Sequence, residues 1–205
     1  MSSVKIPGEI AQNAEFRLYE SVEGEDVYWF HRVVSTMDTA CGLIKNGSAG
    51  IIAADEQTCG RGRYGKSWFS LPGGLYFSWI TREEERFPFF LSELVTLSLV
   101  ETMSSFGIIC NIKLPNDIIT CDKKKLAGIL IEKKGEFYNI GVGINVNNRM
   151  DVIETGISMS MLLGRPLDDR TEILKRFISR FHINKKNFSE KEEFYLGKWS
   201  VNLIK

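Results

Sequence analysis

The sequence predicts an α+β fold, an α/β sandwich-like arrangement in which a mixed central sheet is flanked by helices. Short runs of β-branched and aromatic residues, bounded by turn residues, recur along the chain and are typical of strands. Longer segments carry apolar residues at helical spacing. The links between the last strand-like runs are too short for a crossover helix, so we expect antiparallel or mixed pairing in that half of the sheet.

The first half of the chain contains three expected strands and one expected helix. Residues 27–34 are rich in β-branched and aromatic residues and indicate a strand. A helix is expected next, because Ser35 and Asp38 are spaced as in a capping box, in which side chains satisfy the first backbone N–H groups of a helix. Residues 49–56 and 74–80 are further short apolar runs and predict strands.

The second half begins and ends with an expected helix. Residues 89–106 place apolar side chains close to helical spacing and predict a long, largely buried helix. Strand-like runs follow at 108–115, 125–135 and 137–147. Residues 169–181 carry another apolar stripe at helical spacing and predict the last helix.

The composition argues against several functions. Lys plus Arg and Asp plus Glu both number 26, so no overall positive charge attracts nucleic acid or an anionic membrane. The four cysteines form no C-x-x-C pair and the two histidines are far from them in sequence, which disfavours a zinc site or disulfide framework. A reducing cytoplasm fits this cysteine usage best. No apolar run approaches the roughly 20 residues that span a membrane.

A loop at residues 60–65, GRGRYG, satisfies the G-x-G-x-x-G pattern of a dinucleotide-binding turn. That turn must open a helix, whereas Pro72 and the two glycines after it stop any helix here. The distinctive feature is that Arg61, Arg63 and Lys66 stand among the glycines. Glycine lets a loop fold closely over a ligand, and the planar guanidinium of arginine matches carboxylate or phosphate oxygens. The pattern therefore indicates an anion-binding loop, with a solvated basic loop as the alternative.

A second basic cluster surrounds a proline turn. Lys113, Asn116 and Asp117 lie around the turn, and a run of three lysines at 123–125 opens the next expected strand. Strand alternation puts Lys124 on the opposite face from its two neighbours, so at most two of the three share a site. A solvated edge is the alternative interpretation of the lysine run.

Taken together and in order, six segments resemble the motif set of biotin protein ligases: STMDTA (35–40), ADEQTCGRGRYGKSWFS (54–70), GGLYFS (73–78), KLPNDI (113–118), KKLAGILIE (124–132) and IGVGINVN (140–147). The resemblance implies the catalytic core that class II aminoacyl-tRNA synthetases share with the biotin and lipoate ligases. It also implies two half-reactions. Biotin and Mg-ATP, as substrates, give biotinyl-AMP and pyrophosphate; a lysine of a biotin carboxyl carrier protein then takes the biotinyl group. No tightly bound cofactor and no protein-held metal is expected.

The resemblance assigns roles to individual residues. The implied catalytic residues are Arg61, Arg63, Lys113, Asp117 and Lys125. The implied biotin-binding residues are Ser35, Thr36, Gln57, Arg61, Arg63, Lys125 and Gly128, and the implied ATP-binding residues are Arg63, Trp68, Lys113, Asn116 and Asn145. The positive charges suit the chemistry, because a carboxylate must approach an anionic α-phosphate and like charges a few Å apart repel. Asp117 is expected to orient the carrier amine or to accept its proton.

Several of these residues have a structural alternative. Ser35 and Thr36 can cap the helix that they begin, and Trp68 can belong to the core. Asn145 can be a turn residue at a strand end, and the glycines at 141 and 143 are expected to allow close backbone approach rather than to bind phosphate.

The domain organisation departs from that of many biotin protein ligases. We expect a catalytic domain over residues 1–185 and a tail over 186–205, where an SH3-like domain begins in many relatives. About 26 residues precede the first expected strand, too few for the DNA-binding winged helix of bifunctional members, so no DNA partner is expected. Lys66 and Leu114 stand where arginine and tryptophan are commoner, which loses a bidentate fork and some packing volume.

Three other functions stay open. A lipoate or octanoate ligase shares the fold, although the double-arginine loop favours biotin. A catalytically incomplete biotin- or nucleotide-binding subunit would bind ligand without accumulating adenylate. A nucleic-acid-binding protein is disfavoured by the balanced charge. A monomer or a homodimer without membrane attachment is expected.

Overall fold

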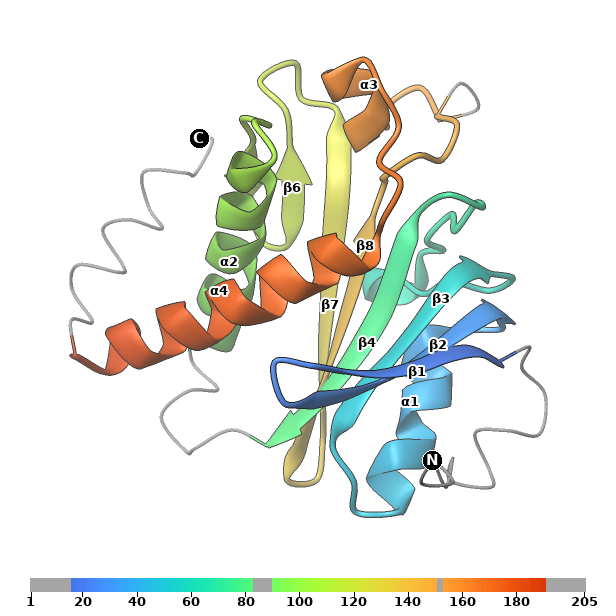
Figure 1. Cartoon of the computed structure of the whole chain (residues 1–205), viewed down its shortest axis with the longest axis vertical. Coiled ribbons are helices and arrows are strands. Elements are labelled where there is room, and N and C mark those ends of the chain that lie inside the picture. Colours follow the sequence, from blue (N-terminus) through green and yellow to red (C-terminus); the bar gives the residue numbers. More distant parts are fainter. Residues whose placement is uncertain (1–15, 83–89, 151–152, 191–205) are drawn as a thin grey trace. The chain divides into compact units, whose positions relative to one another are not determined.

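The computed structural model describes residues 16–82, 90–150 and 153–190 of the chain (Figure 1). Its elements are β1 (Phe16–Val22), β2 (Glu25–Val33), α1 (Thr36–Lys45), β3 (Gly50–Gln57), η1 (Arg63–Gly65), β4 (Leu75–Arg82), α2 (Leu91–Ser105), β5 (Asn111–Lys113), β6 (Asp117–Ile119), β7 (Lys125–Lys134), β8 (Phe137–Ile144), α3 (Met159–Leu163) and α4 (Thr171–Glu190). The strands hydrogen-bond in the order β1-β2-β3-β4-β8-β7-β6-β5. β2 and β3 are parallel, whereas β1-β2, β3-β4, β4-β8, β5-β6 and β6-β7 are antiparallel, so the predicted mixed sheet is confirmed.

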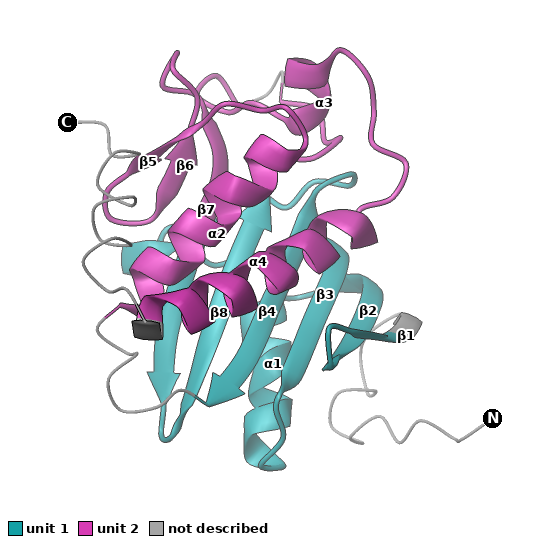
Figure 2. Ribbon diagram, turned by 60° about the vertical axis from the view of Figure 1, so that its left-hand side comes forward, with its two compact units in different colours: residues 1–83, 129–144 teal, residues 84–128, 145–205 magenta. Residues whose placement is uncertain are grey.

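The chain divides into two compact units (Figure 2). Unit 1 comprises residues 1–83 and 129–144, and unit 2 comprises residues 84–128 and 145–205. The boundary falls within β7, whose first four residues belong to unit 2 and whose remainder belongs to unit 1. Each unit holds its own group of the predicted site residues.

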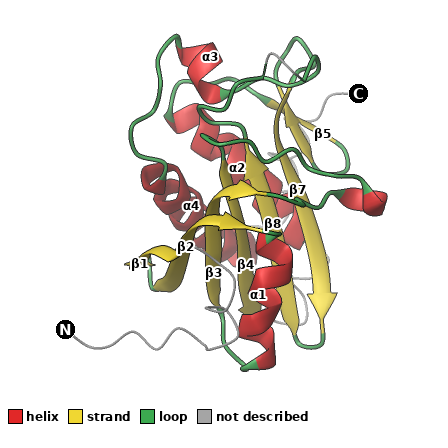
Figure 3. Cartoon of the chain, turned by 90° about the vertical axis from the view of Figure 1, so that its right-hand side faces the viewer, coloured by secondary structure: helices red, strands yellow, loops and turns green. Residues whose placement is uncertain are grey.

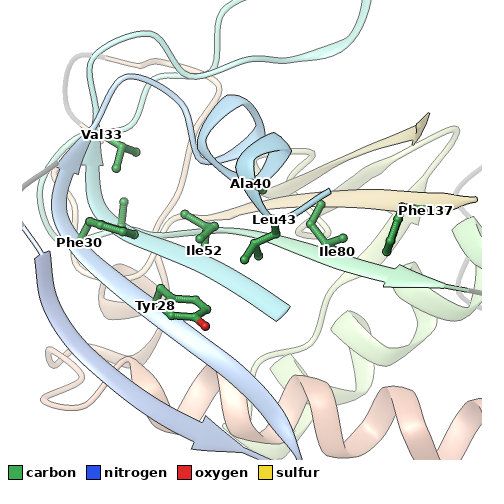
Figure 4. Packing of buried hydrophobic residues seen from close by; sticks show 9 residues of the cluster. Tyr28, Phe30, Val33, Ala40, Leu43, Ile52, Ile80 and Phe137 are labelled. Carbon is green, nitrogen blue, oxygen red and sulfur yellow. The ribbon is translucent and has the colours of Figure 1, made fainter. Parts of the chain in front are cut away.

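In unit 1, α1 connects the parallel strands β2 and β3 and lies against the sheet (Figure 3). Parallel neighbours need such a crossover, because a tight turn reverses the direction of the chain. The core under α1 consists of Tyr28, Phe30, Val33, Ala40, Leu43, Ile52, Ala54, Ile80 and Phe137 (Figure 4). Burying one large apolar side chain contributes about 1.5–3 kcal/mol. This cluster therefore holds α1 against the sheet through Ala40 and Leu43.

In unit 2, α2 and α4 pack side by side (Figure 2). Arg176 of α4 donates a hydrogen bond to the backbone oxygen of Ser105 at 3.1 Å, and the buried Asn184 side chain donates to Ser98 Oγ at 3.0 Å. The apolar stripe predicted for α4 is buried: Ile173, Leu174, Phe177, Ile178 and Phe181. Burial of this stripe explains why a helix with so many charged residues is stable.

Most predicted elements are confirmed, with one strand and one argument corrected. The predicted strand at 108–115 is too long, because only Asn111–Lys113 join the ladder and a turn then leads into β6. The alternation argument for the lysine run is wrong, because Lys123 and Lys124 precede β7. Lys123 has a left-handed φ of 61°, which no strand residue adopts.

Four elements, β1, η1, β6 and α3, are absent from the sequence predictions. β1 pairs with β2 and begins at Phe16, earlier than the first predicted strand. β6 and α3 are both short. The last helix is also longer than predicted, since α4 ends at Glu190. The tail expected from residue 186 thus begins within α4, and residues 191–205 lie outside the described residues.

Candidate active site

A chain of hydrogen bonds joins four polar side chains of unit 1. The Ser78 hydroxyl donates to Thr36 Oγ1 at 2.9 Å, and the Thr36 hydroxyl donates to Gln57 Oε1 at 3.0 Å. The Thr36 backbone N–H also donates to Gln57 Oε1, at 2.7 Å. Gln57 Nε2 in turn donates to Ser70 Oγ at 2.7 Å. Because both ends of the Gln57 amide are engaged, its orientation is fixed. The structure therefore brings the predicted residues Thr36 and Gln57 together.

Ser35 carries a buried hydroxyl beside this chain. Its exposed fraction is 0%, and its Oγ makes no hydrogen bond within the described residues. Ser35 occupies the N-cap position of α1, but its side chain does not cap the helix, so the predicted capping box with Asp38 is wrong. A buried hydroxyl without a partner costs about 1–3 kcal/mol, a cost that a hydrogen-bonding ligand would remove.

The glycine–arginine loop, residues 60–68, closes on itself as a short hairpin. Trp68 N–H donates to the Gly60 oxygen at 2.8 Å, and Gly62 N–H donates to the Lys66 oxygen at 2.7 Å. A Cβ atom at Gly60 would lie 2.5 Å from the Trp68 oxygen and 2.6 Å from Ser70 Oγ, so a larger residue does not fit there. The loop contains one 3-10 turn, η1, and leads into a strand rather than a helix. The dinucleotide interpretation is therefore excluded, as predicted.

Arg61 is held by two carboxylates from different elements. Its Nη1 lies 2.7 Å from Asp38 Oδ1 of α1, and its Nη2 donates to Glu132 Oε1 of β7. Burial lowers the pKa of Arg61, but the charges of Glu132 and Asp38 and their hydrogen bonds outweigh it and raise the pKa above its ordinary value. Arg61 is thus a permanent cation in a charge-compensated setting. A hollow of about 260 Å³ lies between the loop and β7, with Leu130 and Glu132 on the β7 side.

The other predicted residues of the loop lie near its tip and its end. The Arg63 guanidinium carbon is 4.9 Å from the centre of the Tyr64 ring, and Arg63 Nη2 donates to the Tyr64 hydroxyl at 3.0 Å. Trp68 lies against β8, where a Cβ atom at Gly143 would come within 2.5 Å of the indole. Gly143 is therefore needed for close approach, as predicted.

In unit 2, Lys125 and Asp117 form an ion pair, with Nζ 2.7 Å from Oδ1. Asp117 stands opposite Gly128 in the β6–β7 ladder and opposite Lys113 in the β5–β6 ladder. Lys113 is exposed, and Asn116 lies in the turn between β5 and β6. The strands β5, β6 and β7 therefore bring together all five predicted residues of this segment in unit 2: Lys113, Asn116, Asp117, Lys125 and Gly128.

Asn145 fastens the chain after β8 to the start of β7. Its N–H donates to the Leu126 oxygen at 2.9 Å, and its Nδ2 donates to the Lys125 oxygen at 3.2 Å. Its Oδ1 accepts from Asn148 Nδ2 at 3.1 Å. These bonds give Asn145 the structural role of a strand-end residue.

The residues after Asn145 line a hollow that the sequence did not indicate. Its volume is about 530 Å³, within the range of small-molecule sites. Its lining includes Lys124, Asn147, Arg149, Ser158 and Ser160, all in unit 2. Glu154 lines the hollow as well, so this mixed charged, amide and hydroxyl lining suits a polar small molecule.

The described residues hold no group of three or more His, Cys, Asp or Glu side chains placed to bind a metal ion. Nor does any helix among them have the length and apolarity that crossing a membrane requires.

Known proteins resemble this chain in sequence and in fold. The sequence profile described as the Biotin/lipoate A/B protein ligase family matches residues 29–147, which is more than half of the chain. The chain belongs to this family. Its fold, with a mixed sheet flanked by helices, is the biotin protein ligase catalytic fold, as the resemblance in sequence implied.

Similar family members are biotin protein ligases. The chain is 32% identical over 183 residues to the bifunctional ligase/repressor BirA of Bacillus spizizenii, covering 80% of this chain and 56% of that protein. It is 26% identical to a biotin–[acetyl-CoA-carboxylase] ligase of Mycobacterium tuberculosis, covering 71% of this chain and 60% of that protein. A solved structure of the Aquifex aeolicus biotin protein ligase in complex with biotin and ATP matches with 31% identity and a TM-score of 0.75, covering 87% of this chain and 78% of that one. The chain thus spans little more than half the length of these curated relatives.

Four further polar residues belong to this part of the family fold but were missed in the sequence. Ser70 and Ser78 complete the hydrogen-bond chain through Gln57, and Asp38 and Glu132 hold Arg61. Each lies inside one of the six motif segments, at a position to which we assigned no ligand contact. Their position inside these motif segments was the sequence signal that could have identified them.

Proposed function

We propose that the chain carries the activity of a biotin protein ligase. In the first half-reaction a carboxylate oxygen of biotin attacks the α-phosphorus of Mg-ATP. A C(O)O–P bond forms, the bond to the β-phosphate oxygen breaks, and magnesium pyrophosphate leaves. In the second, the neutral ε-amine of a carrier-protein lysine attacks the acyl carbon, the amine gives up one proton as the amide forms, and AMP leaves.

One observation carries the proposal: the residues assigned to the biotin head group and the glycine–arginine loop share a hydrogen-bonded base. Gln57 is fixed by Thr36 on one side and by Ser70 on the other, directly beneath Gly60. The biotin ureido group offers both N–H donors and a carbonyl acceptor, and the buried Ser35 hydroxyl can meet either. Fixed polar groups of this kind recognise a ligand by the cost of leaving them unpaired.

The cationic residues are assigned to the charges of the reaction. Arg63, in the glycine–arginine loop, and Lys125, in β7, stabilise the carboxylate and the α-phosphate, whose mutual repulsion opposes adenylate formation. Lys113 contacts phosphate from the β5–β6 hairpin. Asp117, held 2.7 Å from Lys125 Nζ, acts on the carrier amine in the second step. The family resemblance supports these assignments, together with the Lys125–Asp117 pair.

The remaining finer assignments follow the resemblance. Gly128 offers backbone to biotin, whereas Trp68, Asn116 and Asn145 belong to the ATP side. The partner is a biotin carboxyl carrier protein, by analogy with the acetyl-CoA-carboxylase ligases among the relatives. The reaction takes place in the cytoplasm, with the protein as a monomer or a homodimer.

The experiment that tests the function measures adenylate formation. The purified chain is mixed with Mg-ATP and biotin, lipoate, octanoate or no acid, and pyrophosphate release and acyl-AMP mass are followed. We expect an adenylate with biotin alone. An adenylate with lipoate or octanoate would assign the chain to the lipoate and octanoate ligases of the family. If no acid gives an adenylate, the chain is a catalytically incomplete binding subunit.

A matched pair of variants connects the result to the site. Lys125→Met is expected to lose adenylate formation on the order of a hundredfold or more, the scale of removing one group that stabilises developing charge. Lys186→Met removes an exposed lysine of α4 and should leave the rate unchanged. Transfer is then tested by adding a carrier domain and detecting a biotinylated lysine.

A further inference from the structure

Arg61 has a different setting from that of a cation awaiting an anionic ligand. Both of its terminal nitrogens are engaged, Nη1 with Asp38 at 2.7 Å and Nη2 with Glu132. Lys134 lies 3.6 Å from the second Glu132 oxygen, so two positive and two negative side chains compensate one another. An approaching phosphate or carboxylate would gain little attraction from this cluster, because its net formal charge is zero.

The two carboxylates belong to elements outside the loop. Asp38 is in the first turn of α1, and Glu132 is in β7. Glu132 is the better buried, with its side chain 22% exposed against 57% for Asp38. Charge-assisted hydrogen bonds to arginine are directional, so two such bonds fix a guanidinium in place. Arg61 is therefore tied to two rigid elements at the base of the hairpin, where its backbone also bridges to Ser67.

We propose that Asp38 and Glu132 are positioning residues that fix Arg61 as the anchor of the glycine–arginine loop. The loop tip, which carries Arg63, then closes over the acyl-adenylate from a fixed base. This inference rests on the proposed function for the identity of the ligand, but the anchoring itself does not. Arg61 contributes by holding the loop, and Arg63 contributes the charge that meets the anion.

A competing arrangement predicts the opposite change in ligand binding when a carboxylate is removed. If Arg61 left its carboxylates to bind the ligand directly, Asp38 and Glu132 would compete with the ligand. Removing one carboxylate would then release Arg61 and tighten binding. If they anchor Arg61, removing one loosens the loop and weakens ligand retention. Glu132→Gln, which keeps shape and removes charge, separates the two arrangements.

The first measurement needs no ligand. Trypsin cleavage after Arg63 and Lys66 requires local opening of the loop, and mass spectrometry of the fragments gives its rate. We expect Glu132→Gln to speed this cleavage about threefold to tenfold, the scale of a charge-assisted hydrogen bond weakened by partial solvent screening. Glu56→Gln is the control, because Glu56 pairs with Arg32 at 2.9 Å, is 27% exposed and also lies in unit 1. Unchanged cleavage in Glu132→Gln would overturn the proposal.

The second measurement is the rate at which bound biotinyl-AMP leaves the chain after excess reagents are removed. We expect faster release of biotinyl-AMP from Glu132→Gln, and a smaller change in the same direction from Asp38→Asn. Because the Asp38 side chain is exposed, this second substitution should not disturb folding. The double variant Arg61→Gln/Glu132→Gln should be no worse than the worse single variant, because both act through one contact. Slower release from Glu132→Gln would establish the competing arrangement. If no acid gives an adenylate, the proposed function fails while the cleavage rates still decide the anchor.

Discussion

Replacing Thr36 by valine tests the hydrogen-bond chain at the start of α1. The substitution keeps the shape and removes the hydroxyl that accepts from Ser78 and donates to Gln57, while the Thr36 N–H bond to Gln57 is retained. The bond to Gln57 is worth about 0.5–1.5 kcal/mol, and the Ser78 hydroxyl, 0% exposed, loses its acceptor at about 1–3 kcal/mol. The added methyl returns less than about 1 kcal/mol. We expect the free energy of unfolding to fall by about 2 kcal/mol.

Urea denaturation measures this change as a lower midpoint with an unchanged m-value. Thr102→Val is the matched control, because Thr102 is equally buried but its hydroxyl donates only to the Ser98 backbone oxygen, at 2.7 Å. We expect the control to lose about 1 kcal/mol or less. If the two variants lose the same free energy, the hydroxyls of Thr36 and Ser78 do not act as a connected chain, and the fixed orientation of Gln57 needs another explanation.

Other expected outcomes concern the hairpin, the indole and a buried thiol. Asp117→Asn should keep adenylate formation within a fewfold and slow transfer from preformed adenylate by a factor on the order of 10²–10⁴, measured in single turnover; normal transfer would remove Asp117 from the second step. Gly143→Ala should displace Trp68 and lower the thermal midpoint, since the added Cβ would lie 2.5 Å from the indole; an unchanged midpoint and unchanged tryptophan fluorescence would contradict that contact. Burial, with a smaller effect of the neighbouring Cys121 charge, raises the pKa of Cys110 to about 12, so its thiol stays protonated at pH 8 and reacts as a thiolate only as the pH approaches that value. Iodoacetamide labelling at pH 8, read by mass spectrometry, should therefore spare Cys110 and modify the exposed Cys121; equal labelling would show that Cys110 is not buried.

Sequence analysis predicted the helices and strands that have a recognisable local pattern of apolar residues. The apolar stripe of α4 repeats with the helical period, and β3, β4, β7 and β8 are marked by short apolar runs between turn residues. β6 did not appear because three residues are too few for any period to be visible. β1 did have a signal, since Glu23 and Gly24 link it to β2 as a two-residue hairpin turn, both with positive φ.

The contacts that shape the candidate site depend on distances along the chain that no local pattern contains. Arg61 and Glu132 are 71 residues apart, and Ser78 and Thr36 are 42 apart. Sequence reasoning found one member of each pair: Arg61 because arginine between glycines is unusual, and Thr36 through the family resemblance. It could not find the partners, because a glutamate or a serine in a strand is ordinary until the fold brings it to an arginine or a threonine.

The glycine–arginine loop shows why the same G-x-G-x-x-G pattern can serve different chemistry in different structural settings. In a dinucleotide-binding turn the glycines let pyrophosphate reach the N-terminus of a helix, so the helix supplies the positive end. Here the chain folds back into a hairpin and the next element after η1 is the strand β4, so the positive charge must come from side chains. Arg61 is compensated by two carboxylates, whereas Arg63 is carried at the tip. In the anchoring that we propose, Arg61 holds the loop and Arg63 meets the anion, so exchanging their environments would impair both roles.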